Sequence, residues 1–192
     1  MGKKGLPDAL SAIAAAQPSK RIELWFQDEA RVGQKGRTCH VWWLRGQRPP
    51  GLADKRFSFA YVFAAVEPAT GRNACLVLPE VSTVAMQVFL DSFSATLAPE
   101  VHAALVVDGA GWHTSVALRV PDNVTLVPLP PYAPELNPIE RVWLYLRERF
   151  LSHRLHADYT AVLDAACEAW LKLTPDRLRS LTAYPWLPQV NS

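Results

Sequence analysis

"AALVVDG" (residues 103–109) is a short, continuously apolar run that ends in Asp-Gly. Such a run is typical of a strand buried on both faces of a partly parallel sheet. "VTLVPL" (124–129) has the same character, so we expect a second such strand there, with a short helix between the two. Upstream, Met86, Phe89 and Phe93 fall at helical spacing, which predicts a helix that crosses over to the first of these strands.

Before that helix, the apolar period is two rather than 3.6. "RIELWFQDEA" alternates and predicts a strand. Three further strands are expected in meander-like hairpins, at 40–46, 56–66 and 73–78. This first half of the sheet is therefore predicted to be antiparallel, in contrast to the parallel second half.

Two amphipathic runs after the last strand predict helices, at 137–151 and 159–173. The whole order predicts one α/β domain with a mixed sheet over residues 21–182. We expect residues 1–20 to be a lead-in segment around a short Ala-rich turn, and residues 183–192 to be a C-terminal tail.

Composition limits the class of protein. The 192 residues, 49% of them hydrophobic, suit one domain with a sizeable core. No stretch approaches the roughly 20 consecutive apolar residues that a membrane span needs, so we expect no membrane segment and a cytoplasmic location. The three cysteines are far apart and odd in number, which fits a reducing compartment better than a metal pair or a disulfide set.

The net charge is only +2, but basic residues are concentrated between residues 31 and 56. Seven basic side chains there accompany a single acid, and two tryptophans interleave with them. Such a block suits a surface that faces a polyanion such as DNA, although a solvated hairpin rim has the same composition. The candidates for DNA contact in this block are Arg31, Lys35, Arg37, Arg45 and Arg48.

Two aspartates occupy unusual positions on predicted strands. Asp28 follows Ile22, Leu24 and Phe26 on one strand face, so a charge ends a column that points into the core. Such a carboxylate needs a partner, a metal ion or a place at the rim of the sheet. Asp108 ends the buried strand quoted first, where ligands usually bind in open α/β sheets. An Asp-Gly turn would also account for Asp108 without any function.

Glu140 has a structural alternative as well. With Asn137 as N-cap and Pro138 at the first helical position, Glu140 falls where a capping box places a glutamate. It also lies at the edge of the apolar stripe of its helix, from which a carboxylate can face the sheet. The sequence alone leaves a cap and a chemical role both open.

Asp28, Asp108 and Glu140 can converge on one pocket in this order of strands and helices. Three carboxylates repel one another unless divalent cations neutralise them, and oxygen ligands favour Mg²⁺ or Mn²⁺. Two such ions support phosphoryl transfer to water or to a 3′-hydroxyl. The set therefore predicts nuclease or strand-transfer chemistry.

Four stretches together resemble a known family: "FQDEARVG" (26–33), "WWLRGQRP" (42–49), "VVDGAGWHTS" (106–115) and "LPPYAPELNPIERVW" (129–143). They are similar to the catalytic domain of DDE transposases of the Tc/mariner-like superfamily, in the branch found in bacterial insertion sequences. The resemblance extends from about residue 20 to about residue 180. It implies a ribonuclease H-like fold, with a mixed five-stranded sheet flanked by helices.

The resemblance also implies roles and partners. By position, Asp28, Asp108 and Glu140 match the three catalytic, metal-binding acids, which implies Mg²⁺ or Mn²⁺, two ions, and cleavage and transfer of DNA strands at insertion-sequence ends. Transposon-end and target DNA are the implied partners, with a homodimer in the synaptic complex. Unlike many relatives, this chain has Gly109 after its second aspartate.

Relatives carry helix-turn-helix modules before the catalytic domain, whereas 27 residues precede Asp28 here. We therefore expect a catalytic half that lacks its own recognition modules, with a separately encoded helix-turn-helix polypeptide as a possible partner. Two alternatives stay open: an inactive remnant that only binds DNA or a partner weakly, and a cellular nuclease of the same fold. Two further side chains, His113 and Arg147, are candidates for DNA contact.

Overall fold

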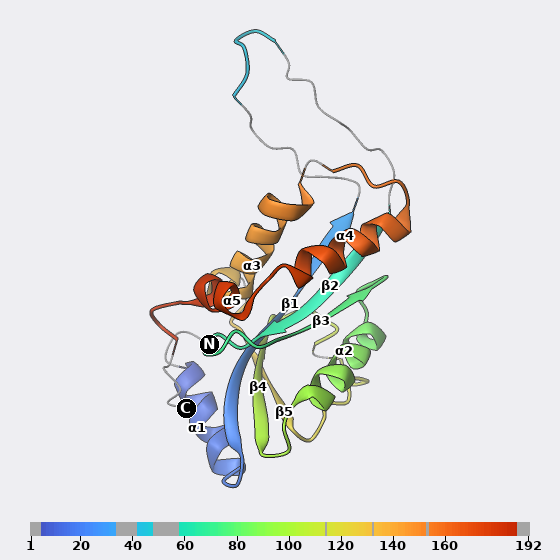
Figure 1. Cartoon of the computed structure of the whole chain (residues 1–192). Coiled ribbons are helices and arrows are strands. Elements are labelled where there is room, and N and C mark those ends of the chain that lie inside the picture. The colour runs from blue at the N-terminus through green and yellow to red at the C-terminus, as the bar shows by residue number, and fades with distance from the viewer. Residues whose placement is uncertain are drawn as a thin grey trace.

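A computed structural model describes residues 5–33, 42–47, 58–113, 115–131, 133–152 and 154–187. Its centre is a five-stranded sheet in the order β3-β2-β1-β4-β5 (Figure 1). The strands are β1 (Arg21–Gly33), β2 (Phe59–Val66), β3 (Asn73–Leu78), β4 (Val101–Val107) and β5 (Val124–Pro128). The β1–β2 and β2–β3 pairs are antiparallel, and the β1–β4 and β4–β5 pairs are parallel. The predicted mixed sheet is confirmed.

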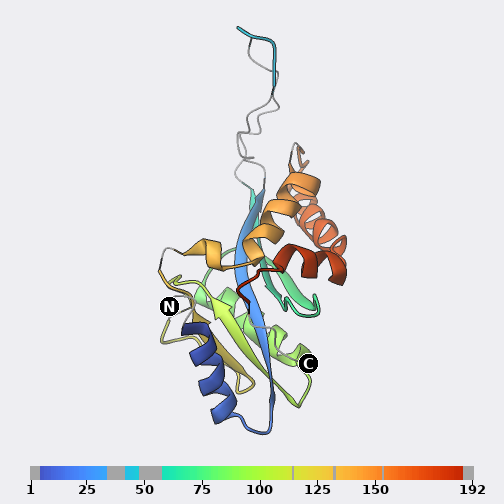
Figure 2. The same ribbon diagram turned by 90° about the vertical axis from the view of Figure 1, so that its left-hand side faces the viewer.

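Helices cover both faces of this sheet (Figures 1 and 2). Helix α2 (Thr83–Thr96) lies on one face, where Phe89 and Phe93 pack against Trp25 and Phe63. The other face carries the remaining helices, which are α1 (Gly5–Ala16), α3 (Ile139–Leu146), α4 (Tyr159–Leu171) and α5 (Pro175–Thr182). Two short segments, η1 (Pro134–Leu136) and the π-helical turn η2 (Arg147–Leu151), flank α3. The predicted order of the long helices is confirmed.

Side chains alternate along β1, so successive residues pack in the hydrophobic cores on opposite faces of the sheet. Leu24 and Phe26 pack with α1, while Trp25 packs with α2. β4 is buried along its whole length, which explains its unbroken apolar sequence. β1 continues five residues past Asp28 as the partner of β2, so the strand is longer than the alternating run predicts.

Three local predictions are wrong. The Ala-rich segment near the start is helix α1, whose Ile13 is buried against the sheet, and not a turn. The strand predicted at 40–46 is absent from residues 42–46, the part of it that is described; residues 45–47 form a turn. Between β4 and β5, the described residues form turns rather than a short helix. Glycine and proline near α1 suggested a turn where a helix forms, whereas glycines 109 and 111 after β4 favour the turns that are observed.

The C-terminal part of the chain returns to the sheet. Helix α5, which the sequence did not predict, buries Leu178 beside α3 and α4. After it, Trp186 lies edge-on to Phe26, with 6.4 Å between the ring centroids. The described residues of the predicted tail therefore pack on the domain. None of the helices in the described part of the chain has the length and hydropathy needed to cross a membrane.

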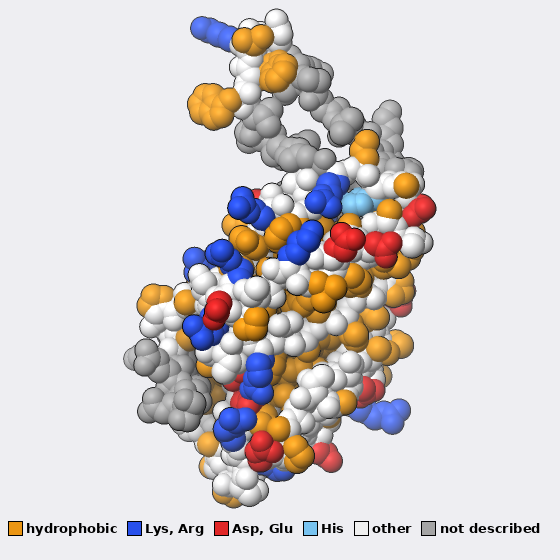
Figure 3. Space-filling model, viewed as in Figure 1, with side chains coloured by type: hydrophobic (Ala, Val, Ile, Leu, Met, Phe, Trp, Pro, Cys, Tyr) orange, Lys and Arg blue, Asp and Glu red, His pale blue; other side chains and the backbone are white. Residues whose placement is uncertain are grey.

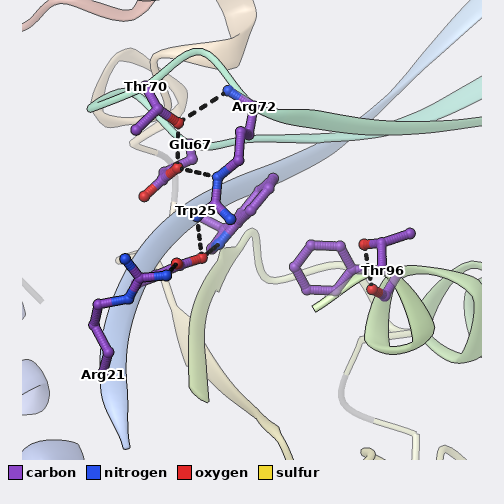
Figure 4. Close-up of polar contacts among 8 residues, drawn as sticks. Arg21, Trp25, Glu67, Thr70, Arg72 and Thr96 are labelled. Atoms are coloured by element: carbon purple, nitrogen blue, oxygen red, sulfur yellow. Dashed lines mark hydrogen bonds and ion pairs between the residues drawn. The ribbon is translucent and has the colours of Figure 1, made fainter. Parts of the chain in front are cut away.

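A buried ionic network fixes the start of β1 to the β2–β3 turn (Figure 4). Glu23, which is 4% exposed, receives Arg21 at 2.8 Å and the indole Nε1 of Trp25 at 3.2 Å, and it pairs with Arg72. Arg72 also binds Glu67 at 2.8 Å. A buried carboxylate needs such donors, and these hold the strands in register far from the carboxyl end of β4.

Candidate active site

The parallel register between β1 and β4 brings the two aspartates together. Phe26 pairs with Val106, and this is the last residue pair of the β1–β4 ladder. Two residues further along the chain from this pair lie Asp28, still on β1, and Asp108, the first residue after β4. Because parallel strands end at the same edge of a sheet, both carboxylates lie where β4 stops and β1 continues.

The third acid comes from the first turn of α3. Asn137 donates its side-chain Nδ2–H to the backbone oxygen of Gln27 at 3.0 Å, and its Oδ1 accepts from the N–H of Ile139 at 3.3 Å. These contacts attach the start of α3 to β1, one residue before Asp28. Glu140 is thereby placed on the sheet side of the site.

The capping box predicted for Glu140 is not formed. In that motif, the glutamate would accept the backbone N–H of Asn137. That N–H donates instead to the oxygen of Pro134 at 2.8 Å. The helix begins at Ile139, with Pro138 as its cap residue, so the predicted start differs by one residue. Glu140 is left free to face the cavity.

A single cavity of about 400 Å³ is lined by Asp28, Asp108 and Glu140 together. Its wall on one side is the proline-rich loop, through Pro130, Pro131 and Pro134. Because proline fixes φ, this wall has few conformations available to it. The carboxylates thus meet in a pocket with a stiff rim.

The electrostatics of the cavity show uncompensated negative charge. Burial, with Glu140 nearby, raises the pKa of Asp28 to about 7. Burial also raises the pKa of Glu140, and Asp108 adds to that rise while Arg147 opposes it. The pKa of Asp108 is lowered, chiefly by a hydrogen bond from His113. Two of the three acids therefore hold protons more tightly than usual, chiefly because they are buried and also because another carboxylate lies near each of them.

Trp143 supports Asp28 directly. Its indole Nε1–H donates to Asp28 Oδ2 at 2.8 Å, from the turn of α3 that follows Glu140. Trp143 is 4% exposed and packs in the core with Trp170, as its helical phase predicts. Nothing in the sequence pattern of this helix indicates the hydrogen bond from Trp143 to Asp28.

His113 lies inside the protein rather than on its surface. Its side chain is 1% exposed, with Nδ1 at 2.8 Å from Asp108 Oδ1 and Nε2 at 3.1 Å from Glu29 Oε1. Burial alone would lower the pKa of His113, but its bonds to Asp108 and Glu29 raise it to about 9. The DNA contact predicted for His113 does not fit this structure, because both ring nitrogens are engaged by carboxylates and the ring is shielded from solvent.

The other candidates for DNA contact are spread over the molecule. Arg31, on β1, lies 4.5 Å from the ring centroid of Phe59, and Arg45 is exposed in the segment 42–47. Arg147 is half-buried close enough to Glu140 to influence its pKa. Lys35, Arg37 and Arg48 lie outside the described residues. Figure 3 shows that Lys and Arg side chains gather over α3 and α5.

The donor set fits a hard divalent cation, since it consists of carboxylate oxygens. As the side chains lie, however, no three His, Cys, Asp or Glu residues in the described part of the chain close around a single ion. The cavity therefore offers the right ligand chemistry in an open arrangement. Mutual repulsion between Asp28 and Glu140 is the feature that a cation would relieve.

Sequence reasoning missed Glu29, which lies on the opposite strand face from Asp28. It also missed the use of the His113 ring between two acids. The sequence offered little signal, because Glu23, Gln27 and Glu29 give this strand face a polar pattern that only Trp25 interrupts. A buried polar pair on such a face needs partners, and these come from the loop after β4.

Comparisons with known proteins show the family of this chain. The family model described as "DDE superfamily endonuclease" matches residues 23–162. An uncharacterised protein of Sinorhizobium fredii, y4pE/y4sA, is 44% identical over 130 residues, which cover 67% of this chain and 96% of that protein.

Solved structures show the same fold. A Mos1 transposase paired-end complex with the left transposon end matches with a TM-score of 0.67 at 17% identity, covering 94% of this chain and 56% of that chain. The catalytic domain of Mos1 mariner transposase matches with a TM-score of 0.54 at 14% identity, covering 94% of this chain and 84% of that chain. A Mos1 paired-end complex with Mn matches with a TM-score of 0.64 at 13% identity, covering 91% of this chain and 56% of that chain. This chain therefore spans a little over half the length of the transposase chains in the paired-end complexes. It belongs to the DDE superfamily of endonucleases, and it shares its fold with the catalytic domain of Mos1 mariner transposase.

Proposed function

We propose that this domain cleaves DNA strands at the ends of an insertion sequence and transfers them to new sites, with divalent metal ions bound by Asp28, Asp108 and Glu140. The observation that carries the proposal is the convergence of these three carboxylates, from β1, the end of β4 and the start of α3, on one cavity. Mos1 structures with transposon-end DNA, with Mn and with Mg share the fold.

The chain's own residues prepare this site. Trp143 orients Asp28 through its indole N–H, and Asn137 sets the position of the helix that carries Glu140. Bound Mg²⁺ or Mn²⁺, which we take to be two ions, would activate a water or a 3′-hydroxyl and stabilise the leaving oxygen. Bound cations would favour the deprotonated form of Asp28, because their positive charge would offset the effects of burial and of the nearby Glu140 on its pKa.

Basic side chains beside the cavity suit a DNA backbone. Arg147 is the candidate nearest to the three acids by its effect on Glu140. Arg31 and Arg45 are exposed, and Lys35, Arg37 and Arg48 remain candidates from the sequence. We further propose that the working form is a homodimer on paired ends, and that a helix-turn-helix polypeptide supplies recognition of the terminal repeats.

The direct test is cleavage of a DNA duplex that carries the element's ends, in the presence of Mn²⁺. The parent protein is expected to nick it, and Asp28→Asn, Asp108→Asn and Glu140→Gln are each expected to abolish nicking. Glu135→Gln is the matched control, because Glu135 is an exposed acid in the same proline-rich loop and does not line the cavity. If the three cavity variants nick as well as the parent, the assignment is wrong. If the parent binds DNA but shows no Mn²⁺ binding and yields no cleavage product, the protein is better explained as an inactive remnant.

A further inference from the structure

Glu29 has an unusual set of neighbours for a buried glutamate. Its side chain is 6% exposed and lies on the α2 face of the sheet, away from the cavity. Three donors converge on one oxygen, Oε1: Gln27 Nε2 at 2.9 Å, Trp112 Nε1 at 3.3 Å and His113 Nε2 at 3.1 Å. Such convergence on one buried oxygen fixes the carboxylate in a single orientation.

Gln27 shows how strongly this orientation is imposed. The side chain of Gln27 is fully buried, and its Oε1 is without a partner among the described residues. Reversing the amide would place that oxygen against Glu29 Oε1 and bring two acceptors together. The amide therefore donates to Glu29 even though its own oxygen stays unsatisfied, which is a cost that proteins usually avoid.

His113 contacts one acid on each side of the sheet, Glu29 and Asp108. Its Nδ1 lies 2.8 Å from Asp108 Oδ1 and 3.2 Å from the backbone oxygen of Asp108. Because β4 ends at Val107, no strand separates the two faces at this point. The ring is therefore held at both ends, by Glu29 on the α2 side and by Asp108 at the rim of the cavity.

The same contacts limit how Asp108 can lie. Oδ1 accepts from His113 and also from the N–H of Ala110 at 3.0 Å. Both bonds fall on one oxygen, so Oδ2 is the oxygen that remains for a metal ion. An aspartate just past the end of a strand has no ladder to hold it, and here the histidine supplies that support.

We propose that Glu29 is a positioning residue, which acts through His113 to hold Asp108 in the orientation that binds the divalent cation. The proposal rests on the proposed function, since it takes Asp108 to be a metal ligand. Outer contacts of this kind usually change metal affinity by about 10- to 100-fold when they are removed. Glu29 itself touches neither the cavity nor the cation.

A double-mutant cycle on Mn²⁺ affinity, measured by calorimetry without DNA, tests this path. Glu29→Ala and His113→Ala are each expected to weaken Mn²⁺ binding by about tenfold or more. The double variant is expected to bind no more weakly than His113→Ala alone, because Glu29 reaches Asp108 through that ring. The charge of Glu29 also raises the pKa of Asp28, and Glu29→Gln removes that charge while keeping the contact to the ring. Glu29→Gln keeps an oxygen that can accept from Nε2–H, so a smaller loss is expected, which again adds nothing to His113→Ala.

Glu23→Gln is the matched control. Glu23 lies on the same face of the same strand, is equally buried and also accepts an indole N–H, but it lies among Arg21, Arg72 and Trp25 away from the cavity (Figure 4). It is expected to keep the parent's Mn²⁺ affinity. If Glu29 had a purely structural role, Glu29→Gln and Glu23→Gln would have the same Mn²⁺ affinity.

A second readout needs no metal. In the nuclear magnetic resonance spectrum of the metal-free protein, the Nε2–H proton of His113 is expected to be protected from exchange in the parent and in Glu23→Gln. Glu29→Ala is expected to lose that signal. Loss of the signal in Glu23→Gln as well would contradict the assigned contact.

The outcomes separate this inference from the proposed function. Asp28→Asn does not touch the network, so its loss of Mn²⁺ binding supports the metal site independently. If Asp28→Asn loses Mn²⁺ binding while the folded Glu29 variants bind like the parent, the positioning role is overturned and the proposed function stands. Fully additive losses in the double variant would also overturn it. A parent protein that takes up no Mn²⁺ overturns both.

Discussion

Trp143 and Asp28 are joined by a hydrogen bond of 2.8 Å from indole Nε1 to carboxylate Oδ2, which links the helix that carries Glu140 to the strand that carries the first aspartate. The bond gives a buried carboxylate one of the donors it needs. It also fixes the distance between two of the three elements that form the cavity. A core tryptophan is thereby part of the site's geometry.

Replacing Trp143 by phenylalanine is expected to damage both stability and metal binding. The variant removes the donor and leaves Asp28 less satisfied, at a cost of about 1–3 kcal/mol in the free energy of unfolding. Mn²⁺ affinity is expected to fall about tenfold, as for other outer contacts to a metal ligand. Trp25→Phe is the matched control, because Trp25 makes the equivalent indole bond to Glu23 at 3.2 Å. Calorimetry should show a stability loss in both variants and an affinity loss only in Trp143→Phe; equal affinity losses would contradict the assigned role.

The raised pKa of Asp28 predicts a pH dependence of stability in the metal-free protein. The folded protein holds this proton up to about pH 7, whereas an unfolded aspartate releases it near 3.8. Between these values the folded state binds more protons, so the contribution of Asp28 to stability falls as pH rises from about 4 to 7 and is flat above that range. Asp28→Asn removes the effect and is expected to exceed the parent by about 1–3 kcal/mol at pH 8.

Denaturant unfolding at pH 4, 6 and 8 measures this difference. Asp176→Asn, whose side chain is 88% exposed on α5, controls for the loss of an aspartate away from the cavity. Saturating Mn²⁺ is expected to restore the parent at pH 8, by about 2.7 kcal/mol at 100 times its dissociation constant. A parent that gains stability relative to Asp28→Asn between pH 4 and 7 without metal would contradict the prediction.

The fold was predictable where a residue pattern is compatible with only one arrangement of strands and helices. The alternation of Leu24, Trp25 and Phe26 requires two different cores on either side of β1, and the structure provides them. The buried run of β4 requires helices on both faces. Helix α1 was not predictable in this way, because its stability comes from packing Ile13 on a sheet that the local sequence does not contain.

The site was predictable only in its acids. Asp28 and Asp108 end apolar patterns, and that is visible along the chain. The contact between Glu29 and His113 spans 84 residues, and the one between Trp143 and Asp28 spans 115. Both depend on where a loop or a helix returns to the sheet, which no local spacing encodes. The contacts that support the site residues from outside the cavity can therefore be identified only from the tertiary structure.

Variants of Asn137 and Glu140 distinguish a helix-capping role from a catalytic role at the start of α3. Asn137→Ala loses two hydrogen bonds, to the backbone of Gln27 and from that of Ile139, and is expected to cost about 1–3 kcal/mol of stability. Glu140→Gln is expected not to lower stability, because no capping box is formed and the variant relieves the repulsion from Asp28. Thermal unfolding and DNA nicking with Mn²⁺ are measured on both variants.

Nicking activity should fall more in Glu140→Gln than in Asn137→Ala, which is the opposite of the order expected for stability. Glu140→Gln is expected to lose more activity than the roughly 10- to 100-fold typical of an outer contact, while Asn137→Ala retains part of it. A large loss of stability in Glu140→Gln with its nicking intact would restore the cap as the role of Glu140.

Arg147 is expected to bind a DNA phosphate beside the cavity. Arg147→Gln removes a cation that opposes the raised pKa of Glu140, so that pKa is expected to rise further. DNA affinity is expected to fall, and the slope of log affinity against log salt concentration to decrease in magnitude by about 1, as for the loss of one phosphate contact. Arg119→Gln is the control, since Arg119 is an exposed arginine whose backbone contacts Gln87 of α2, on the other face of the sheet. Fluorescence anisotropy with a catalytically inactive Asp108→Asn background, at several salt concentrations, gives both slopes. Equal slopes for the two arginine variants would remove Arg147 from the DNA-binding surface, because a contact beside the cavity must change the number of counterions released and a remote arginine must not.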